Sequence, residues 1–169
     1  AARLAQRLLD GFADRVMPAD DPPGDRFESV LDRVERFLRE RPTTLERYRQ
    51  LESPEAERLA AEATTDAAWD AIARGRGLTP TGLRANLMLA EKEFRASAFE
   101  RSLARLRRID GHPDLEDVTL ASAYWFLRGA SAACMANVAE REEAINRLRQ
   151  LNEPVATEAA AAASVATGS

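Results

Sequence analysis

One apolar segment constrains the fold of this chain more than any other feature. From Thr79 to Val138 the sequence predicts a long amphipathic helix, a short break at Asp110-Gly111-His112-Pro113, and a second helix over Leu115 to Val138. The second helix is apolar on nearly every side, so one neighbouring helix cannot cover it. We therefore expect a second copy of the chain to pack against this helix.

The first half of the chain predicts four further helices. Apolar residues repeat at helical spacing from Leu4 to about Met17, and again from Phe27 to Leu38, where Pro42 follows as a stop. A short helix is expected around Leu45 to Leu51. Ser53-Pro54 then has the form of a helix start, because an N-cap serine precedes a proline at the first helical position.

In the second half of the chain, residues typical of helix starts and ends define the expected helices. An alanine stripe extends the fourth helix to Ile72, and we expect Gly75 and Gly77 to end it in the left-handed conformation. Thr79-Pro80 repeats the start signal for the long helix, which is expected to bend near Ser97. Asp114 is the expected cap of the next helix, and Glu140 to Leu151 forms a last short one.

These segments predict an all-α fold, an antiparallel bundle of about six to seven helices. No segment alternates apolar and polar residues with β-branched enrichment, so no strand is expected. Residues 1–152 are interpreted as one helical domain. Residues 153–169 are interpreted as a flexible Ala-rich tail, because the chain after Pro154 carries no apolar stripe.

Charge and cysteine content narrow the class of protein. The chain has 24 Lys and Arg against 28 Asp and Glu, for a net charge of −4, and lacks a long basic run. It is therefore not expected to hold nucleic acid by itself, since that requires a concentrated positive face. One cysteine, no signal peptide and no apolar run near 18 residues predict a cytoplasmic protein without a membrane segment.

Residues for catalysis are sparse, and no enzyme, metal site or cofactor is predicted. His112 is the only histidine, which excludes multi-histidine metal sites, and no Gly-rich phosphate loop or GxSxG motif is present. We interpret His112 as a solvent-facing turn residue, with gating between two helices as the alternative. Asp66 with Asp70, and Glu91 with Glu93, are interpreted as solvated helix faces.

Cys134 and a set of three arginines each have a structural and a functional interpretation. Cys134 lies among small residues and is expected to be a buried contact between helices, with a reactive thiol as the alternative. Arg101, Arg105 and Arg108 form a stripe near a helix end. They are expected to complement the helix dipole, and contact with an anion is the other interpretation.

Large apolar side chains supply a candidate ligand site. Packing in the core accounts for them, but a cavity between bundled helices is also typically apolar with a few polar groups, for which Tyr124, Asn86 and Thr65 are available. The candidate ligand-binding residues are Trp69, Leu87, Phe94, Phe99 and Tyr124.

Most of Ala1 to Leu151 resembles the C-terminal effector-binding and dimerisation region of TetR/AcrR-type transcriptional regulators, in the branch near the mycofactocin regulators. The segments that carry the resemblance are the opening helix with the loop Pro18 to Gly24, Arg39-Glu40-Arg41-Pro42, Ala73-Arg74-Gly75-Arg76-Gly77-Leu78-Thr79-Pro80, Leu83-Arg84-Ala85, the Phe94 region, Asp110-Gly111-His112-Pro113-Asp114-Leu115, and Gly129 in an apolar helix.

The resemblance implies a homodimer whose last two helices, here Leu115 to Val138 and Glu140 to Leu151, form a four-helix bundle with their copies above a cavity for a small, largely apolar effector. DNA binding would then belong to an N-terminal helix-turn-helix, for which this chain has no room before Leu4. The expected dimer-interface residues are Leu120, Leu127, Ser131, Cys134 and Leu148.

The alternative is a helical adaptor. Leu89 to Ile109 also resembles a tetratricopeptide hairpin, with Ala90, Phe94, Phe99, Ser102 and Leu106 near the expected places. A second copy placed on Ala144 lies 42 residues beyond Ser102, whereas the repeat has about 34 residues. The adaptor would bind a protein partner in a groove of stacked hairpins and need not dimerise.

Overall fold

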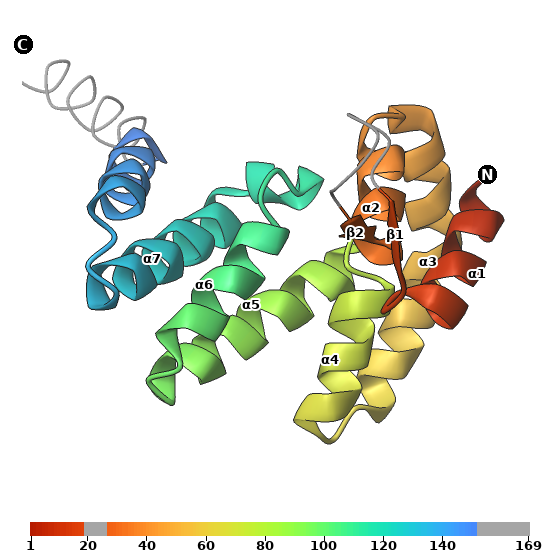
Figure 1. The fold of residues 1–169 in the computed structure, drawn as a ribbon, viewed down its shortest axis with the longest axis horizontal. Helices are drawn as coiled ribbons and strands as arrows, with labels where there is room; N and C mark the ends of the chain where they lie inside the picture. Colours follow the sequence, from red (N-terminus) through yellow and green to blue (C-terminus); the bar gives the residue numbers. More distant parts are fainter. Residues whose placement is uncertain (19–26, 152–169) are drawn as a thin grey trace, which may run out of the picture. The chain divides into compact units, whose positions relative to one another are not determined.

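The computed structural model describes residues 1–18 and 27–151, which are mostly helical, so the all-α prediction is confirmed (Figure 1). The chain divides into two compact units, residues 1–86 and residues 87–169, and the boundary falls within α5 (Pro80–Arg95). Each unit is described by itself. The loop expected at Ala19 to Gly24 and the tail expected after Pro154 lie outside the described residues.

The first unit is built on α1 (Ala2–Phe12), α2 (Val30–Arg39) and α3 (Pro42–Glu62), with α4 (Asp66–Gly75) following. The first three helices pack against one another around Leu9, Leu38 and Tyr48. The Tyr48 hydroxyl, buried among these side chains, donates a hydrogen bond to Gln6 Oε1 at 2.9 Å. This pairing satisfies two buried polar groups that would otherwise destabilise the core.

A short two-stranded ribbon joins α1 to α2, so the expectation of no strand was wrong. Strand β1 (Val16–Pro18) pairs antiparallel with β2 (Phe27–Ser29), with Met17 opposite Glu28. The first helix therefore ends at Phe12, five residues before the expected end near Met17. Three-residue strands are too short for an alternating pattern to show in the sequence.

Helix α3 runs through Pro54 without a break, and the prediction of two helices there was wrong. Proline removes one backbone donor, but Tyr48 and Ala56, on either side of it, are both buried and hold the two halves of the helix against the core. The alanine stripe is divided instead at Ala63, where the backbone turns extended. Thr65 then caps α4, its hydroxyl accepting from Ala68 N at 3.2 Å.

The glycines near α4 act differently from the prediction. Neither Gly75 nor Gly77 is left-handed, and Gly111 is the glycine with a positive φ in the described part of the chain. The position that requires glycine is Gly82, where a Cβ would lie 2.0 Å from the Arg76 carbonyl oxygen. Thr79-Pro80 does start a helix: the Thr79 hydroxyl accepts from Gly82 N at 3.1 Å.

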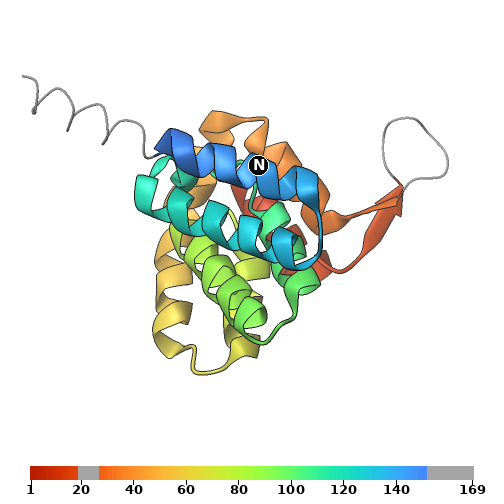
Figure 2. The same cartoon turned by 90° about the vertical axis from the view of Figure 1, so that its left-hand side faces the viewer.

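The second unit contains two consecutive hairpins. The first joins α5 to α6 (Phe99–Arg108), and the second joins α7 (Val118–Cys134) to a final helix over residues 138–151. A 3-10 turn, η1 (Pro113–Glu116), lies between the hairpins. Figure 2 shows α7 and the final helix, in blue, side by side. The apolar helix is thus shorter than the expected Leu115 to Val138.

Each hairpin has the same type of turn between its two helices. Ser97 and Ala136 have φ of 59° and 56°, so the expected single long helix bent near Ser97 is two helices. After α5, Ala98 N donates to Glu93 O and Ser97 N donates to Phe94 O, at 2.8 and 2.9 Å. After α7, Asn137 N and Ala136 N donate to Ala132 O and Ala133 O in the same way, at 2.9 and 3.1 Å. These paired bonds define a Schellman helix end.

Two local expectations in this unit were also wrong. Asp114 does not cap the apolar helix: Asp117 does, its Oδ1 accepting from Thr119 N and Leu120 N at 3.0 Å each. His112 is not exposed to solvent. Its side chain is buried, and Nδ1 accepts from Asp114 N at 3.1 Å, which starts η1. His112 is therefore a local cap between α6 and α7.

Within residues 1–18 and 27–151, no helix combines the length and the apolar content that crossing a bilayer requires.

Candidate functional site

Helix α7 has a buried side and an exposed side that differ in chemistry. Tyr124, Leu127, Arg128 and Ser131 are on the buried side, where α7 packs against α6. We call the opposite side the uncharged face; it is formed by the exposed residues Val118, Thr119, Ala123, Phe126, Ala133 and Cys134. Arg128 is the only charged residue among the 17 of α7, so this face carries no charge.

Phe126 dominates the uncharged face. Its side chain lies near the middle of α7 and is 62% exposed, and Val118 at the start of the helix is 55% exposed. Alanines at 123 and 133 leave the surface shallow on both sides of the Phe126 ring. On the final helix, Val138 and Ile145 are exposed as well. A large exposed aromatic ring between small residues is typical of an interaction surface.

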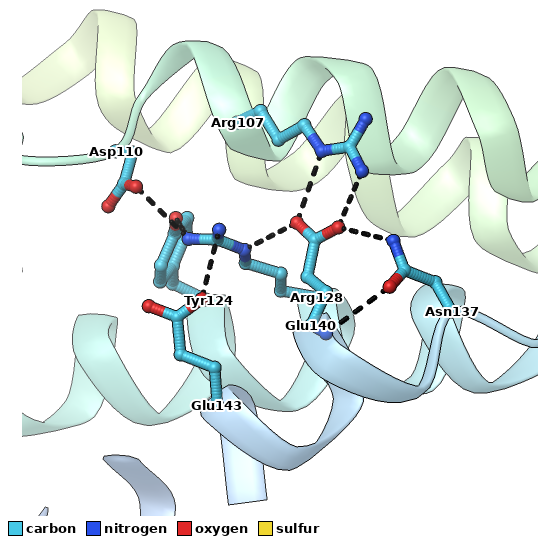
Figure 3. Close-up of polar contacts among 7 residues, drawn as sticks. All are labelled: Arg107, Asp110, Tyr124, Arg128, Asn137, Glu140 and Glu143. Carbon is cyan, nitrogen blue, oxygen red and sulfur yellow. Dashed lines mark hydrogen bonds and ion pairs between the residues drawn. The ribbon is translucent and has the colours of Figure 1, made fainter. Parts of the chain in front are cut away.

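A buried arginine fixes the position of α7 (Figure 3). The Arg128 guanidinium donates from Nε to Glu140 Oε1 at 2.8 Å, and from one terminal nitrogen to the Tyr124 hydroxyl at 2.6 Å and Asp110 Oδ2 at 3.1 Å. The other terminal nitrogen lies 3.5 Å from Glu143 Oε2. These partners come from the end of α6, from α7 and from the final helix, so one side chain connects three elements of the second unit.

Glu140 connects the final helix to α6 and α7 by accepting hydrogen bonds from their arginines. Its two carboxylate oxygens accept from Arg107 Nε and a terminal nitrogen of Arg107 at 3.1 and 2.5 Å. Asn137 caps the helix, because Asn137 Oδ1 accepts from Glu140 N at 3.3 Å, while Asn137 Nδ2 donates to Glu140 Oε2 at 3.0 Å. The Asn137 side chain thus caps the final helix and contacts the Glu140 carboxylate, which is also held by two arginines.

The electrostatics follow from these contacts. The hydrogen bond from Arg107 lowers the pKa of Glu140, burial opposes this shift, and Arg128 adds to it. Burial raises the pKa of the Tyr124 hydroxyl, and Asp110 raises it further, while Arg128 opposes the increase. Near pH 7, Glu140 therefore accepts from Arg128 as a carboxylate, and Tyr124 accepts as a neutral hydroxyl.

Small residues bring the helices of each hairpin together. The Ser102 hydroxyl of α6 donates to the Ala90 carbonyl of α5 at 2.9 Å. In the second hairpin, a Cβ at Gly129 would lie 3.0 Å from the Ala144 Cβ. Ala90, Ser102 and Ala144 are fully buried. Close approach at these points leaves the uncharged face of α7 on the outer side.

The five expected dimer-interface residues do not share one surface. Leu127 and Ser131 are buried within the chain, and the Ser131 hydroxyl donates to Ser102 Oγ at 3.2 Å. Leu120 and Leu148 are half-buried. Cys134 is exposed, which corrects the expectation of a buried cysteine. The exposed neighbour of Leu127 is Phe126, one position away and therefore on another side of the helix.

The five candidate ligand-binding residues are divided between the two units. Phe94 and Phe99 lie together, with ring centroids 5.4 Å apart in an edge-to-face arrangement. Leu87 and Tyr124 are buried in the second unit, and Trp69 is half-buried on α4 of the first unit. A cavity of about 360 Å³ in the first unit has none of the five in its lining. The effector site at these residues stays a prediction.

The polar side chains of the second unit form structural contacts. In the described ranges, no set of three His, Cys, Asp or Glu side chains is grouped to hold a metal ion. Within the predicted arginine stripe, Arg105 pairs with Glu93 at 3.0 Å. Sequence reasoning missed Arg128, Glu140 and Phe126. The available signals were the Asn137-Val138-Ala139-Glu140 capping pattern and a single charge in an otherwise apolar helix.

Searches against family models, curated proteins and solved structures find no match to this chain.

Proposed function

We propose that the second unit is a pair of tetratricopeptide-like helical hairpins that binds a protein partner, and that this chain acts by binding rather than by catalysis. The observation that carries the proposal is that the two hairpins are built alike. Each has a first helix that ends in a Schellman turn with a non-glycine residue at positive φ, followed directly by an antiparallel second helix.

The small contact residue occupies the same place in both hairpins. Ala90 precedes the turn residue Ser97 by seven positions, and Gly129 precedes Ala136 by seven. Each makes the close contact with the second helix of its hairpin, Ala90 through Ser102 and Gly129 through Ala144. Stacked hairpins need such a small residue, because larger side chains would separate the paired helices.

When the two hairpins are aligned on their turns, their spacing in the sequence is closer to the tetratricopeptide repeat length. Ser97 and Ala136 are 39 positions apart, closer to the repeat length of about 34 than the 42 positions between Ser102 and Ala144. The additional residues fall in the link 109–117, which holds η1 and lies outside both hairpins. A longer link between repeats leaves the packing within each hairpin unchanged.

The uncharged face predicts the chemistry of the partner. An extended segment of another protein with an aromatic or aliphatic side chain would place that side chain beside Phe126, over the alanines of α7. The absence of charge on this face disfavours a strongly charged segment, because its ionised groups would lose water without gaining a partner. Recognition of this kind depends on one or two buried apolar side chains.

Selection from a random peptide library displayed on phage tests the proposal. We expect peptides with a shared apolar motif to be enriched on the wild-type chain and to be lost when the immobilised protein carries Phe126→Glu. Arg58→Gln, an exposed change on α3, is the matched control and should keep the enriched peptides. No enrichment on the wild type, or peptides that bind Phe126→Glu equally well, would contradict the proposal.

A second candidate is the sensing and dimerisation module of a TetR-type regulator. It is favoured by the same exposed face, because Phe126, Val138 and Ile145 together would form the apolar side of a four-helix bundle between two copies. In that case the module is cytoplasmic, a small apolar effector binds near Phe94 and Phe99, and DNA is bound by a helix-turn-helix outside these residues.

Light scattering separates the two candidates. A hairpin adaptor is expected to have the mass of one chain, whereas a regulator module should have twice that mass and return to one chain with Phe126→Glu. Leu127→Glu is not suitable for this test, because Leu127 is buried inside the chain and its replacement would unfold the second unit.

A further inference from the structure

The first unit has an apolar groove between two helices. The space is about 360 Å³ and is lined by α1, α2 and Met17 of β1. Along both helices the lining residues follow the spacing i, i+3, i+4, i+7, beginning at Ala1 on the α1 side and at Val30 on α2. Each helix therefore presents two turns of a stripe at heptad spacing to the same space, and its members are apolar except for Arg33 on α2.

The side chains of this groove project into solvent. Leu4 is 61% exposed and Phe37 is 37% exposed, although both line the space. A small molecule within the groove would leave the outer surface of Leu4 in water. An apolar stripe that lies along both helices would cover the Leu4 and Phe37 side chains. Two parallel heptad stripes are the surface into which the side chains of a third helix pack.

The rim of the groove is basic. Arg33 pairs with Glu28 and donates to the Pro18 carbonyl at 2.7 Å, and Arg36 pairs with the same Glu28 at 2.7 Å. The Arg41 guanidinium lies 4.1 Å from the centroid of the Phe37 ring, at the end of the groove.

Arg41 has a carboxylate 3.4 Å away, from Glu40, and Arg7 is exposed beside Leu4, one helical turn along α1. Among residues 1–18 and 27–151, four arginines thus stand against two glutamates on the rim. This excess of positive charge is complementary to acidic residues that flank the apolar stripe of a partner.

We infer that the groove between α1 and α2 binds an amphipathic helix of a partner protein, one with an apolar i, i+3, i+4, i+7 stripe and acidic flanking residues. The inference concerns the first unit and is independent of the peptide face proposed for α7. Its specificity comes from Leu4 and Phe37, which meet the apolar stripe, and from Arg36 and Arg41, which meet the acidic flanks.

Fluorescence anisotropy with designed peptides tests the inference on the full chain. The probe is a labelled peptide of roughly three heptads with leucine at the core positions and glutamate at the flanks. A second peptide replaces every glutamate with lysine. We expect the acidic peptide to bind with a Kd at least about tenfold lower than that of the basic peptide, and added salt to reduce this preference.

Variants of the protein then locate the site. Leu4→Glu and Phe37→Glu should each weaken binding of the acidic peptide by about tenfold or more, and Arg36→Glu with Arg41→Glu should reverse the preference between the peptides. Leu4 and Phe37 are exposed, so both variants are expected to fold, which circular dichroism verifies. Arg58→Gln, an exposed change on α3, is the control and should leave the Kd unchanged, and Phe126→Glu shows whether the peptide binds α7 instead.

Four results would overturn the inference. One is that neither peptide binds. Another is that the acidic peptide binds Leu4→Glu and Phe37→Glu as well as the wild type. The third is that the neutral dye N-phenyl-1-naphthylamine binds in the groove while both peptides fail, which would make it a small-molecule site. A loss of binding in Phe126→Glu alone would also place the peptide on α7 instead.

Discussion

Arg128 Nε lies 2.8 Å from Glu140 Oε1, and both side chains are less than 10% exposed. This contact joins the middle of α7 to the first turn of the final helix, and Arg107 of α6 shares the same carboxylate. The uncharged face of α7 therefore owes its position to a charged cluster on the opposite side of the helix. Breaking the cluster should release the final helix before it disturbs the first unit.

Arg128→Met tests the role of this cluster. Removing the guanidinium leaves Glu140 with Arg107 but deprives the buried Tyr124 hydroxyl of its donor and breaks the Glu140 contact, so we expect the free energy of unfolding to fall by about 2–3 kcal/mol. Hydrogen exchange should rise over residues 138–151. Arg58→Gln breaks two exposed ion pairs on α3 and should change stability by less than about 1 kcal/mol. Equal losses of stability in Arg128→Met and Arg58→Gln would contradict this role of the cluster.

Acid should weaken the attachment of the final helix. The pKa of Glu140 is lowered from 4.5 in the folded chain, so the unfolded chain binds a proton more readily. The stabilisation is therefore complete above pH 4.5 and is lost as the pH falls through the lower folded value. The difference in unfolding free energy between wild type and Glu140→Gln should be constant at neutral pH and shrink below pH 4.5. A difference that does not depend on pH would be inconsistent with this ion pair.

Glycine should stabilise both hairpin turns. Ser97 and Ala136 have φ of 59° and 56°, which disfavours side chains other than glycine, so Ser97→Gly and Ala136→Gly should each raise stability by about 1 kcal/mol. Ala123→Gly, at an exposed position inside α7, should lower stability by about 0.5–1 kcal/mol. Urea unfolding measures all three. Destabilisation by glycine at both turns would mean that the left-handed turns are absent in solution.

Gly82 should not accept a side chain. The Cβ of Gly82→Ala would lie 2.0 Å from the Arg76 carbonyl oxygen, which cannot move without breaking the start of α5. We expect a loss of more than about 2 kcal/mol, in contrast to Gly11→Ala in α1, where the new Cβ meets nothing within 4 Å. Thermal melts of the two variants provide the comparison, and similar melting temperatures would count against the tight α4–α5 turn.

The sequence predicted the helices better than it predicted their ends. Apolar spacing located most helices because periodicity is a property of neighbouring residues. It failed at Pro54, where tertiary packing of Tyr48 and Ala56 keeps α3 continuous, and at Val16 to Pro18, where the strand partner, Phe27 to Ser29, is not adjacent in the sequence. It predicted a bend near Ser97 but not the left-handed turns at Ser97 and Ala136, since a serine or alanine carries no local signal for such a turn.

The candidate site was harder to predict for the same reason. Leu127 and Phe126 are both apolar and adjacent, and only the contact with α6 decides which is buried. The pairing of Arg128 with Glu140 spans a turn whose geometry depends on Ala136. Long-range packing, and not composition, determines which residues of α7 remain available to a partner.

Peptide binding by the uncharged face of α7 is tested most directly by isothermal calorimetry, in which a peptide selected on the wild-type chain is titrated against the wild type, Phe126→Glu and Phe37→Glu. We expect Phe126→Glu to raise the Kd by about tenfold or more, while Phe37→Glu in the first unit leaves it unchanged. Equal affinity for the wild type and Phe126→Glu would show that the uncharged face of α7 is not the binding surface.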